Sequence, residues 1–125
     1  MLTATKLTQY TAPPPGATGG DSGRWSLSAL FAANLVLFAV VAPVVEELTF
    51  RGVGQSLLGF LGRWPSIVLV GVAFGLAHGL VEALLVLVPF GMALAWLRDR
   101  TRSVLPGMVV HGVFNGLALA AAVLT

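Results

Sequence analysis

Residues 27–125 consist almost entirely of apolar stretches of the length that a lipid bilayer requires. A helix needs about 20 apolar residues to cross the bilayer core, and this part of the chain has room for four such helices with short connections. Of the 125 residues, 57% are hydrophobic and 10% are charged, which is too apolar for the surface of a soluble domain. The sequence therefore predicts an all-α fold, a polytopic transmembrane bundle of about four helices.

The first 25 residues differ from the rest of the chain. They are small and polar, with several prolines and glycines before Gly23, and cannot bury enough apolar surface to fold alone. The first apolar run begins only after Trp25, which does not fit a cleaved signal peptide. We therefore divide the chain into a flexible, disordered N-terminal tail, residues 1–25, and a membrane core, residues 26–125.

Glycine, proline and charged residues separate the four predicted helices. We expect these helices at 26 to about 59 or 62, 64–79, 82–97 and 104–123. Pro65 suits the first turn of the second helix, and Pro89 predicts a kink in the third. Gly71, Gly75 and Gly79 are spaced four apart, which predicts close packing against a neighbouring helix.

Basic residues gather at the predicted helix ends. One side of the membrane is expected to carry Arg51, Arg63, Arg98, Arg100 and Arg102. Only Lys6 and Arg24 fall on the other side, so the positive-inside rule places both termini outside. Because the arginines form no basic patch with interleaved aromatic residues, we expect no nucleic-acid partner.

Ionisable side chains lie within the apolar first helix. Such a group costs about 2.5–3.5 kcal/mol at the bilayer centre on insertion scales, so it requires a partner or a function. Glu47 and Arg51 are four residues apart, in the order that favours an ion pair. Glu46 points about 100° away from Glu47 and can face the bundle interior as a general base. Two glutamates at the wet end of a helix explain this segment alone equally well.

The two histidines of the chain also lie in apolar surroundings. His78 falls on the second helix and His111 on the fourth, where Asn115 follows four residues later on the same face. Taken singly, these residues are explained by a polar helix end or by hydrogen bonds between helices. Together with the acidic pair, they indicate a functional site.

Three motifs occur in an order that is typical of one known family. They are Glu46-Glu47-x-x-x-Arg51, Phe74-x-x-x-His78 and His111-x-x-x-Asn115. With these motifs, residues 42–119 resemble the CAAX prenyl endopeptidase and bacteriocin-processing (CPBP or Abi) family. The resemblance implies an intramembrane endopeptidase whose substrate is a peptide or protein in or at the membrane.

The resemblance also implies roles for the polar residues. Glu46 and His78 would activate the attacking water, while His111 and Asn115 would hold the developing oxyanion. Peptide hydrolysis needs such a base, a positioned water and hydrogen-bond donors in a water-poor site, so the chemistry agrees with the residues present.

Two further residues, Glu47 and Arg51, would then fix the local geometry.

A metal site is an alternative, since His78, His111 and Glu46 could hold a divalent metal such as zinc with an open position for water. The family is often classed as metallopeptidase-like. Against a metal, the sequence has no His-Glu-x-x-His segment and the ligands would come from three helices. No cofactor is therefore certain. The chain has no cysteine, which excludes thiolate ligands and disulfides.

The chain departs from the pattern of the family that it resembles before the first motif. Known members usually carry additional membrane helices there, whereas this chain has the polar tail. The chain is then a minimal member, half of an oligomer or a product of truncation, and a homo-oligomer or a partner protein could supply the missing helices. Six arginines against one lysine suggest a GC-rich genome and a prokaryotic plasma membrane.

Two other functions account for part of the pattern. A catalytically silent relative, acting as a membrane scaffold or immunity factor, would keep the polar cluster for helix packing alone. A small proton-coupled four-helix transporter would explain Glu46. It would give no reason for His78, His111 and Asn115 to accompany the glutamate.

Overall fold

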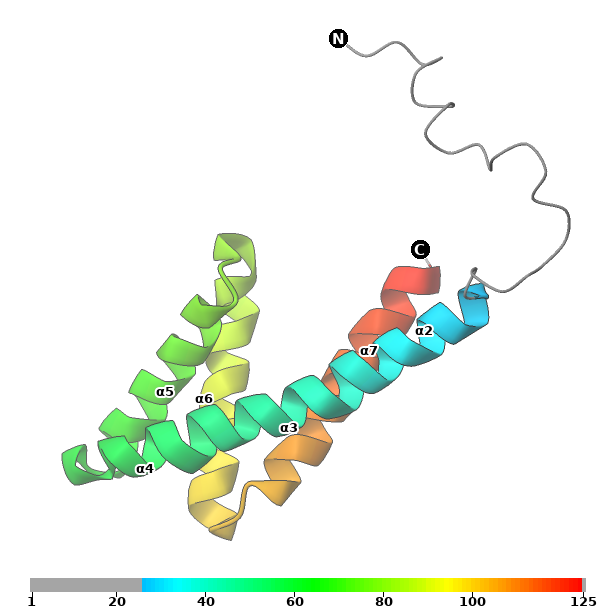
Figure 1. Ribbon diagram of the computed structural model, residues 1–125. Coiled ribbons are helices and arrows are strands. Elements are labelled where there is room, and N and C mark those ends of the chain that lie inside the picture. The colour runs from blue at the N-terminus through cyan, green and yellow to red at the C-terminus, as the bar shows by residue number, and fades with distance from the viewer. Residues whose placement is uncertain (1–25, 125) are drawn as a thin grey trace, which may run out of the picture.

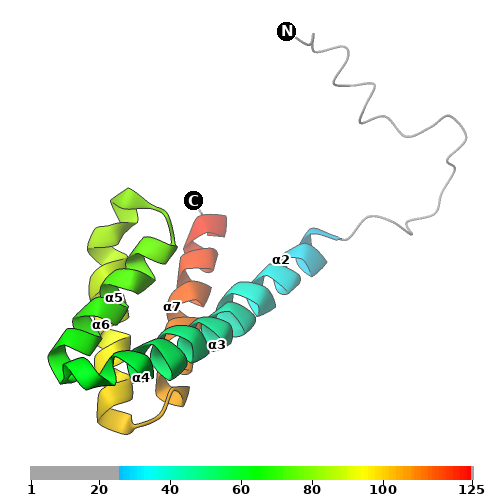
Figure 2. The same cartoon turned by 60° about the vertical axis from the view of Figure 1, so that its left-hand side comes forward.

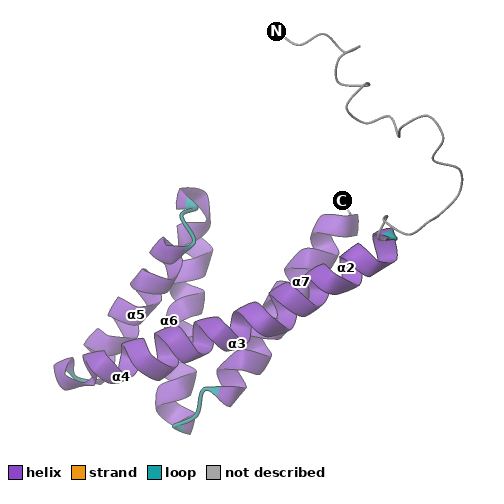
Figure 3. Cartoon of the chain, viewed as in Figure 1, coloured by secondary structure: helices purple, strands orange, loops and turns teal. Residues whose placement is uncertain are grey.

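The computed structural model describes residues 26–124, and every element in this range is helical. The all-α prediction is confirmed. The predicted tail, residues 1–25, lies outside the described residues. Short connections join the helices (Figure 3).

The first helix is longer than a bilayer crossing requires. It is continuous over Ser28–Leu61, a stretch of 34 residues that agrees with the predicted range. Its parts are α2 (Leu27–Val36), a π-helical segment (Leu37–Val41), α3 (Ala42–Glu46), a second π-helical segment (Glu47–Gly54), α4 (Gln55–Leu57) and a 3-10 turn (Leu58–Leu61). The Oγ atom of Ser26 caps the start of α2 by accepting a hydrogen bond from the N–H of Ala29.

Three more helices follow. They are α5 (Arg63–Ala77), α6 (Leu84–Thr101), which a 3-10 turn precedes (Val81–Ala83), and α7 (Leu105–Leu124). Within the described residues, three helices are long and apolar enough to cross a membrane, Ser28–Leu61, Val81–Thr101 and Leu105–Leu124, while Arg63–Ala77 is shorter. The prediction of about four helices is confirmed, but only three of the helices within residues 26–124 have the length of a full crossing.

The third helix ends later than expected. It continues past residue 97 to Thr101 and stops at Arg102, whose φ of 56° is left-handed. Arg98 and Arg100 extend it because cations are favourable in the last turn of a helix. The charged segment predicted to be a connection is therefore partly helical.

Helices α5 and α6 form a closely packed hairpin. A Cβ atom at Gly71 would lie 2.8 Å from the backbone nitrogen of Met92, and one at Gly75 would lie 2.6 Å from a methyl group of Val88. The packing predicted from the glycine spacing is thus confirmed for Gly71 and Gly75. Gly79 has no such neighbour and serves the turn after α5, with a φ of 67°.

The long first helix runs obliquely across the other helices (Figures 1 and 2). Helix α7 packs beside α3 and the preceding π-helical segment, while the α5–α6 hairpin packs near the other end, against Glu47–Gly54. Because the helices cross, residues at different distances from the ends of their helices can lie close together. This crossing brings the C-terminal end of α5 and the N-terminal half of α7 to the same part of the first helix.

Polar side chains are among the most buried in the described part of the chain. Arg51 and Glu47 are 0% exposed and His111 is 2% exposed, whereas large apolar residues such as Phe60 and Leu85 are more than 80% exposed. The apolar core is small and centres on Ile67, with Val70 and Ala95. A polar interior with an apolar exterior is the pattern expected of a protein that lipid surrounds.

Candidate active site

The ion pair predicted between Glu47 and Arg51 is present. The Nη1 atom of Arg51 lies 2.8 Å from the Oε1 atom of Glu47, and both side chains are fully buried. Arg51 also donates from Nη2 to the carbonyl oxygen of Gly91 on α6, at 2.9 Å. Its guanidinium lies 4.4 Å from the ring centroid of Phe74 on α5. The pair therefore connects the first helix to α5 and α6.

We grouped Arg51 with the arginines at the helix ends, and the structure buries its side chain completely inside the bundle. The acidic neighbour four residues earlier explains the burial, because a desolvated guanidinium requires a fixed counter-charge.

Helix α7 reaches the ion pair at Gly107. A Cβ atom there would lie 2.6 Å from the Oε2 atom of Glu47, so only glycine leaves room for the carboxylate. His111, one turn further along, lies with its Nδ1 atom 3.1 Å from the Oε1 atom of Glu47. Since a carboxylate paired with arginine accepts hydrogen bonds, Nδ1 of His111 carries the proton, and its Nε2 atom points away from Glu47.

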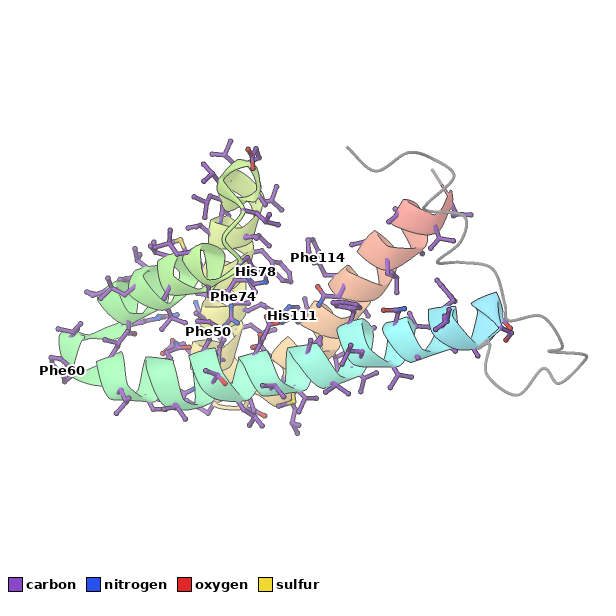
Figure 4. All side chains as sticks on the ribbon, turned by 45° about the horizontal axis from the view of Figure 1, so that its top comes forward. Phe50, Phe60, Phe74, His78, His111 and Phe114 are labelled. Atoms are coloured by element: carbon purple, nitrogen blue, oxygen red, sulfur yellow. The ribbon has the colours of Figure 1, made fainter. Side chains whose placement is uncertain are left out.

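His78 is oriented in the same way. Its Nδ1 atom lies 2.8 Å from the carbonyl oxygen of Phe74, which can only accept, so Nδ1 donates and Nε2 is left free. The Phe74 ring lies 4.7 Å from the His78 ring and 5.4 Å from the His111 ring. Figure 4 shows these three side chains together, and Phe60 at the far end of the long helix.

Glu46 lies between the two histidines. Its Oε2 atom is 3.8 Å from Nε2 of His78 and 3.6 Å from Nε2 of His111. Both distances exceed a hydrogen bond. This oxygen is buried and has no hydrogen-bond partner among the described residues. Buried polar atoms without a partner are uncommon and are found at catalytic centres.

Asn115 donates from Nδ2 to the carbonyl oxygen of Phe38, at 2.9 Å. Pro43 explains why this oxygen is available. The N–H of Ala42 bonds to the carbonyl of Leu37, five residues earlier, and the next bond in this register would run from residue 43 to Phe38. Proline has no N–H to donate. The amide of Asn115 therefore satisfies a carbonyl that the first helix leaves unpaired.

A cavity of about 390 Å³ opens beside Glu46. Its lining is apolar apart from three site residues, and consists of Phe38, Ala42, Glu46, His78, Asn115, Ala118 and Leu119. His111 does not line it and lies deeper in the bundle. An extended, mostly apolar peptide segment at this cavity would meet the carboxylate of Glu46 and the amide of Asn115.

The predicted metal ligands, His78, His111 and Glu46, lie close together. Within residues 26–124, no group of three or more histidine or acidic side chains is arranged to hold a metal ion. The two imidazoles each approach Oε2 of Glu46, at 3.8 Å and 3.6 Å.

All six predicted site residues lie in one region. Glu47 and Arg51 hold helices together, Glu46 and the two histidines converge, and Asn115 lies at the cavity wall. Sequence reasoning missed the contacts that position them, namely Phe38, Pro43, Gly91 and Gly107. A proline inside an apolar helix is the one local signal among these, because it always leaves carbonyl groups to be satisfied elsewhere.

Comparison with known protein families gives one match. A family described as Type II CAAX prenyl endopeptidase Rce1-like matches residues 28–117, which is well over half of the chain and includes all three motifs. Searches of curated proteins and of solved structures found no match. The resemblance inferred from the motifs is confirmed: the chain belongs to the Rce1-like family of type II CAAX prenyl endopeptidases, and its three membrane-length helices make it an integral membrane protein.

Proposed function

We propose that the chain is an intramembrane endopeptidase that hydrolyses a peptide bond with a water activated by Glu46 and His78. The observation that carries this proposal is the convergence on Oε2 of Glu46, which has an Nε2 atom 3.8 Å away on one side and another 3.6 Å away on the other. Membership of a peptidase family supports the reaction type.

Glu46 serves as the general base. Separations of 3.6–3.8 Å between its oxygen and the imidazole nitrogens suit a water that contacts both groups. The carboxylate takes one proton from this water, whose oxygen attacks the peptide carbonyl carbon. Glu46 then gives the proton to the nitrogen of the leaving amine as the C–N bond breaks. His78 orients the water, and its own orientation is fixed by the carbonyl of Phe74.

His111 and Asn115 stabilise the oxyanion. Because Nδ1 of His111 is committed to Glu47, its Nε2 atom can donate only when the imidazole is doubly protonated. Asn115 has two amide hydrogens and uses one for Phe38, so the second is available to the oxyanion.

A metal-dependent form of this proposal would use His78, His111 and Glu46 as ligands. Both histidines have the feature that ligating imidazoles share, an Nδ1–H held by an oxygen acceptor. The mechanism above uses only the side chains of the chain.

A catalytically silent scaffold is the second candidate. It is favoured by one observation: Glu47, Arg51 and Asn115 all use polar atoms to connect the first helix to other helices. Glu46 separates the two candidates, because its buried Oε2 atom makes no such connection within residues 26–124.

Cleavage of a quenched fluorescent peptide library by the detergent-purified protein tests the proposal. Wild type is compared with Glu46→Ala and His78→Ala, and with Glu82→Ala as a matched control, because Glu82 lies on the turn before α6 and outside the cavity. Loss of cleavage in the first two variants alone supports the peptidase. A folded wild type that cleaves nothing favours the scaffold or an absent partner.

We also propose that a second copy or a partner protein supplies further helices.

A further inference from the structure

A second cavity, of about 450 Å³, lies at the opposite end of the α5–α6 hairpin from His78. Its polar lining includes Gln55, Ser56, Arg63, Arg98, Asp99 and Arg102. The turn between α4 and α5 and the turn between α6 and α7 meet here. The contact that joins them is an ion pair of 2.8 Å between Nε of Arg63 and Oδ2 of Asp99.

The lining carries an excess of positive charge that its own contacts do not neutralise. Three arginines face one aspartate. Each guanidinium has five N–H donors. Arg63 uses one on Asp99, Arg98 uses one on the hydroxyl of Ser56 at 2.9 Å, and Arg102 makes no side-chain hydrogen bond or ion pair within the described residues. Most donors of the three groups are therefore available to an anion.

The backbone conformation that places Arg102 at this cavity is strained. Its φ of 56° lies in the left-handed region, which glycine or asparagine usually occupies after a helix. An arginine in this conformation is strained, and such strain is concentrated at functional sites. The conformation ends α6 and brings Arg102 next to Arg98 in the lining of the cavity.

Candidate membrane crossings begin or end beside this cavity. Two candidate membrane crossings end at Leu61 and Thr101, and a third begins at Leu105, all at this end of the bundle (Figure 1). Trp64 and Trp96 lie nearby, beneath guanidinium groups at 5.2 Å and 5.3 Å. Tryptophan prefers the headgroup layer. We therefore expect lipid phosphates near the donors of the cavity.

We propose that this cavity binds a phosphate group through Arg63, Arg98 and Arg102. Guanidinium groups match phosphate oxygens in charge and geometry, and basic pockets between membrane helices bind anionic headgroups. The phosphate belongs to an anionic lipid or to a soluble phosphate, and both sources present the same oxygens. The site is separate from the one at Glu46, so its failure would leave the peptidase proposal unchanged.

Titration of the full chain in an uncharged detergent tests this proposal. The probes are short-chain phosphatidylglycerol, short-chain phosphatidylcholine and inorganic phosphate, with bound molecules counted by native mass spectrometry. We expect one phosphatidylglycerol to bind about tenfold more tightly than phosphatidylcholine, whose choline cation meets the arginines. Competition by inorganic phosphate at similar concentrations supports a soluble source, and no competition supports a lipid. If neither phosphatidylglycerol nor inorganic phosphate binds, the proposal is wrong.

Three variants distinguish anion binding at the cavity from anion binding by general surface charge. Arg102→Gln breaks no contact of the described residues and is expected to weaken anion binding about tenfold. Arg100→Gln removes the same charge two residues away but does not line the cavity, and it should change binding less than about twofold. Asp99→Asn removes the competing carboxylate and should strengthen binding. Equal loss in Arg100→Gln and Arg102→Gln, or weaker binding in Asp99→Asn, contradicts the proposal.

Discussion

The Nδ1 atom of His111 lies 3.1 Å from Oε1 of Glu47, the same oxygen that accepts a hydrogen bond from Arg51. One buried carboxylate oxygen thus has an imidazole and a guanidinium as partners from two different helices. This arrangement fixes the imidazole so that its other nitrogen faces Glu46. The ion pair therefore positions a proposed catalytic group as well as holding the bundle together.

Breaking this ion pair should destabilise the fold strongly. Arg51→Gln leaves the carboxylate of Glu47 buried without its counter-charge, and removing one partner of a buried pair typically costs about 3–5 kcal/mol. The double variant Glu47→Gln/Arg51→Gln removes both charges of the pair and should be more stable than Arg51→Gln alone. Thermal unfolding in detergent, followed by circular dichroism, measures both. If the loss of unfolding temperature in the double variant equals the sum of the losses in the two single variants, the two side chains are not coupled.

Glu46→Gln should abolish cleavage without unfolding the protein. A general base contributes about 10²–10⁴-fold to the rate, and glutamine cannot take the proton. The fold should survive because Oε2 of Glu46 has no hydrogen-bond partner within residues 26–124. The measurement is the initial rate of peptide cleavage together with the unfolding temperature. Glu82→Gln is the control for a lost carboxylate. Cleavage by Glu46→Gln at the wild-type rate would be incompatible with the proposed base.

Helix positions could be predicted from the sequence because the length of an apolar run and the residues that interrupt it are local properties. The pairing of Glu47 with Arg51 follows from a spacing of four within one helix. The end of α6 was predicted too early, since the sequence alone does not show that Arg98 donates a hydrogen bond to Ser56 of α4. The tilt that brings His78 and His111 together depends on how whole helices cross.

The role of Asn115 was harder to predict from the sequence. Its spacing from His111 suggests a shared face and a shared function, but its amide bonds to a carbonyl 77 residues earlier. That carbonyl is free only because Pro43 interrupts a register that the sequence does not specify. The same reasoning explains why Gly107 was not recognised, since its need for a missing side chain arises from Glu47 on another helix.

Chelation should leave the cleavage rate unchanged. The proposed mechanism uses a carboxylate, two imidazoles and an amide, and it has no step that requires a metal ion. The purified protein is incubated with a strong chelator, its metal content is measured by elemental analysis, and cleavage is then followed over time. A loss of activity that zinc restores would replace this mechanism with the metal-dependent form, in which His78, His111 and Glu46 are ligands.

Gly107→Ala should impair both stability and cleavage. The new Cβ atom would lie 2.6 Å from Oε2 of Glu47, so α7 or the carboxylate must move. Either movement shifts His111, whose ring is held by Glu47. Gly116→Ala is the matched control on the same helix, because its Cβ atom would meet its nearest neighbour at an ordinary contact of 3.6 Å. Equal effects of the two substitutions would argue against the close approach at Gly107.

Asn115→Leu should destabilise the protein in a way that Pro43→Ala partly reverses. The substitution leaves the carbonyl of Phe38 without a partner in an apolar environment, which costs about 1–3 kcal/mol. Alanine at position 43 restores a backbone N–H that can bond to a carbonyl of the preceding turn. The Asn115→Leu loss should therefore be smaller in the Pro43→Ala background, as a double-mutant cycle of unfolding temperatures would show. Cleavage should not recover in the double variant, since the second amide hydrogen proposed for the oxyanion is still missing. Recovery of both properties would mean that Asn115 acts only in packing.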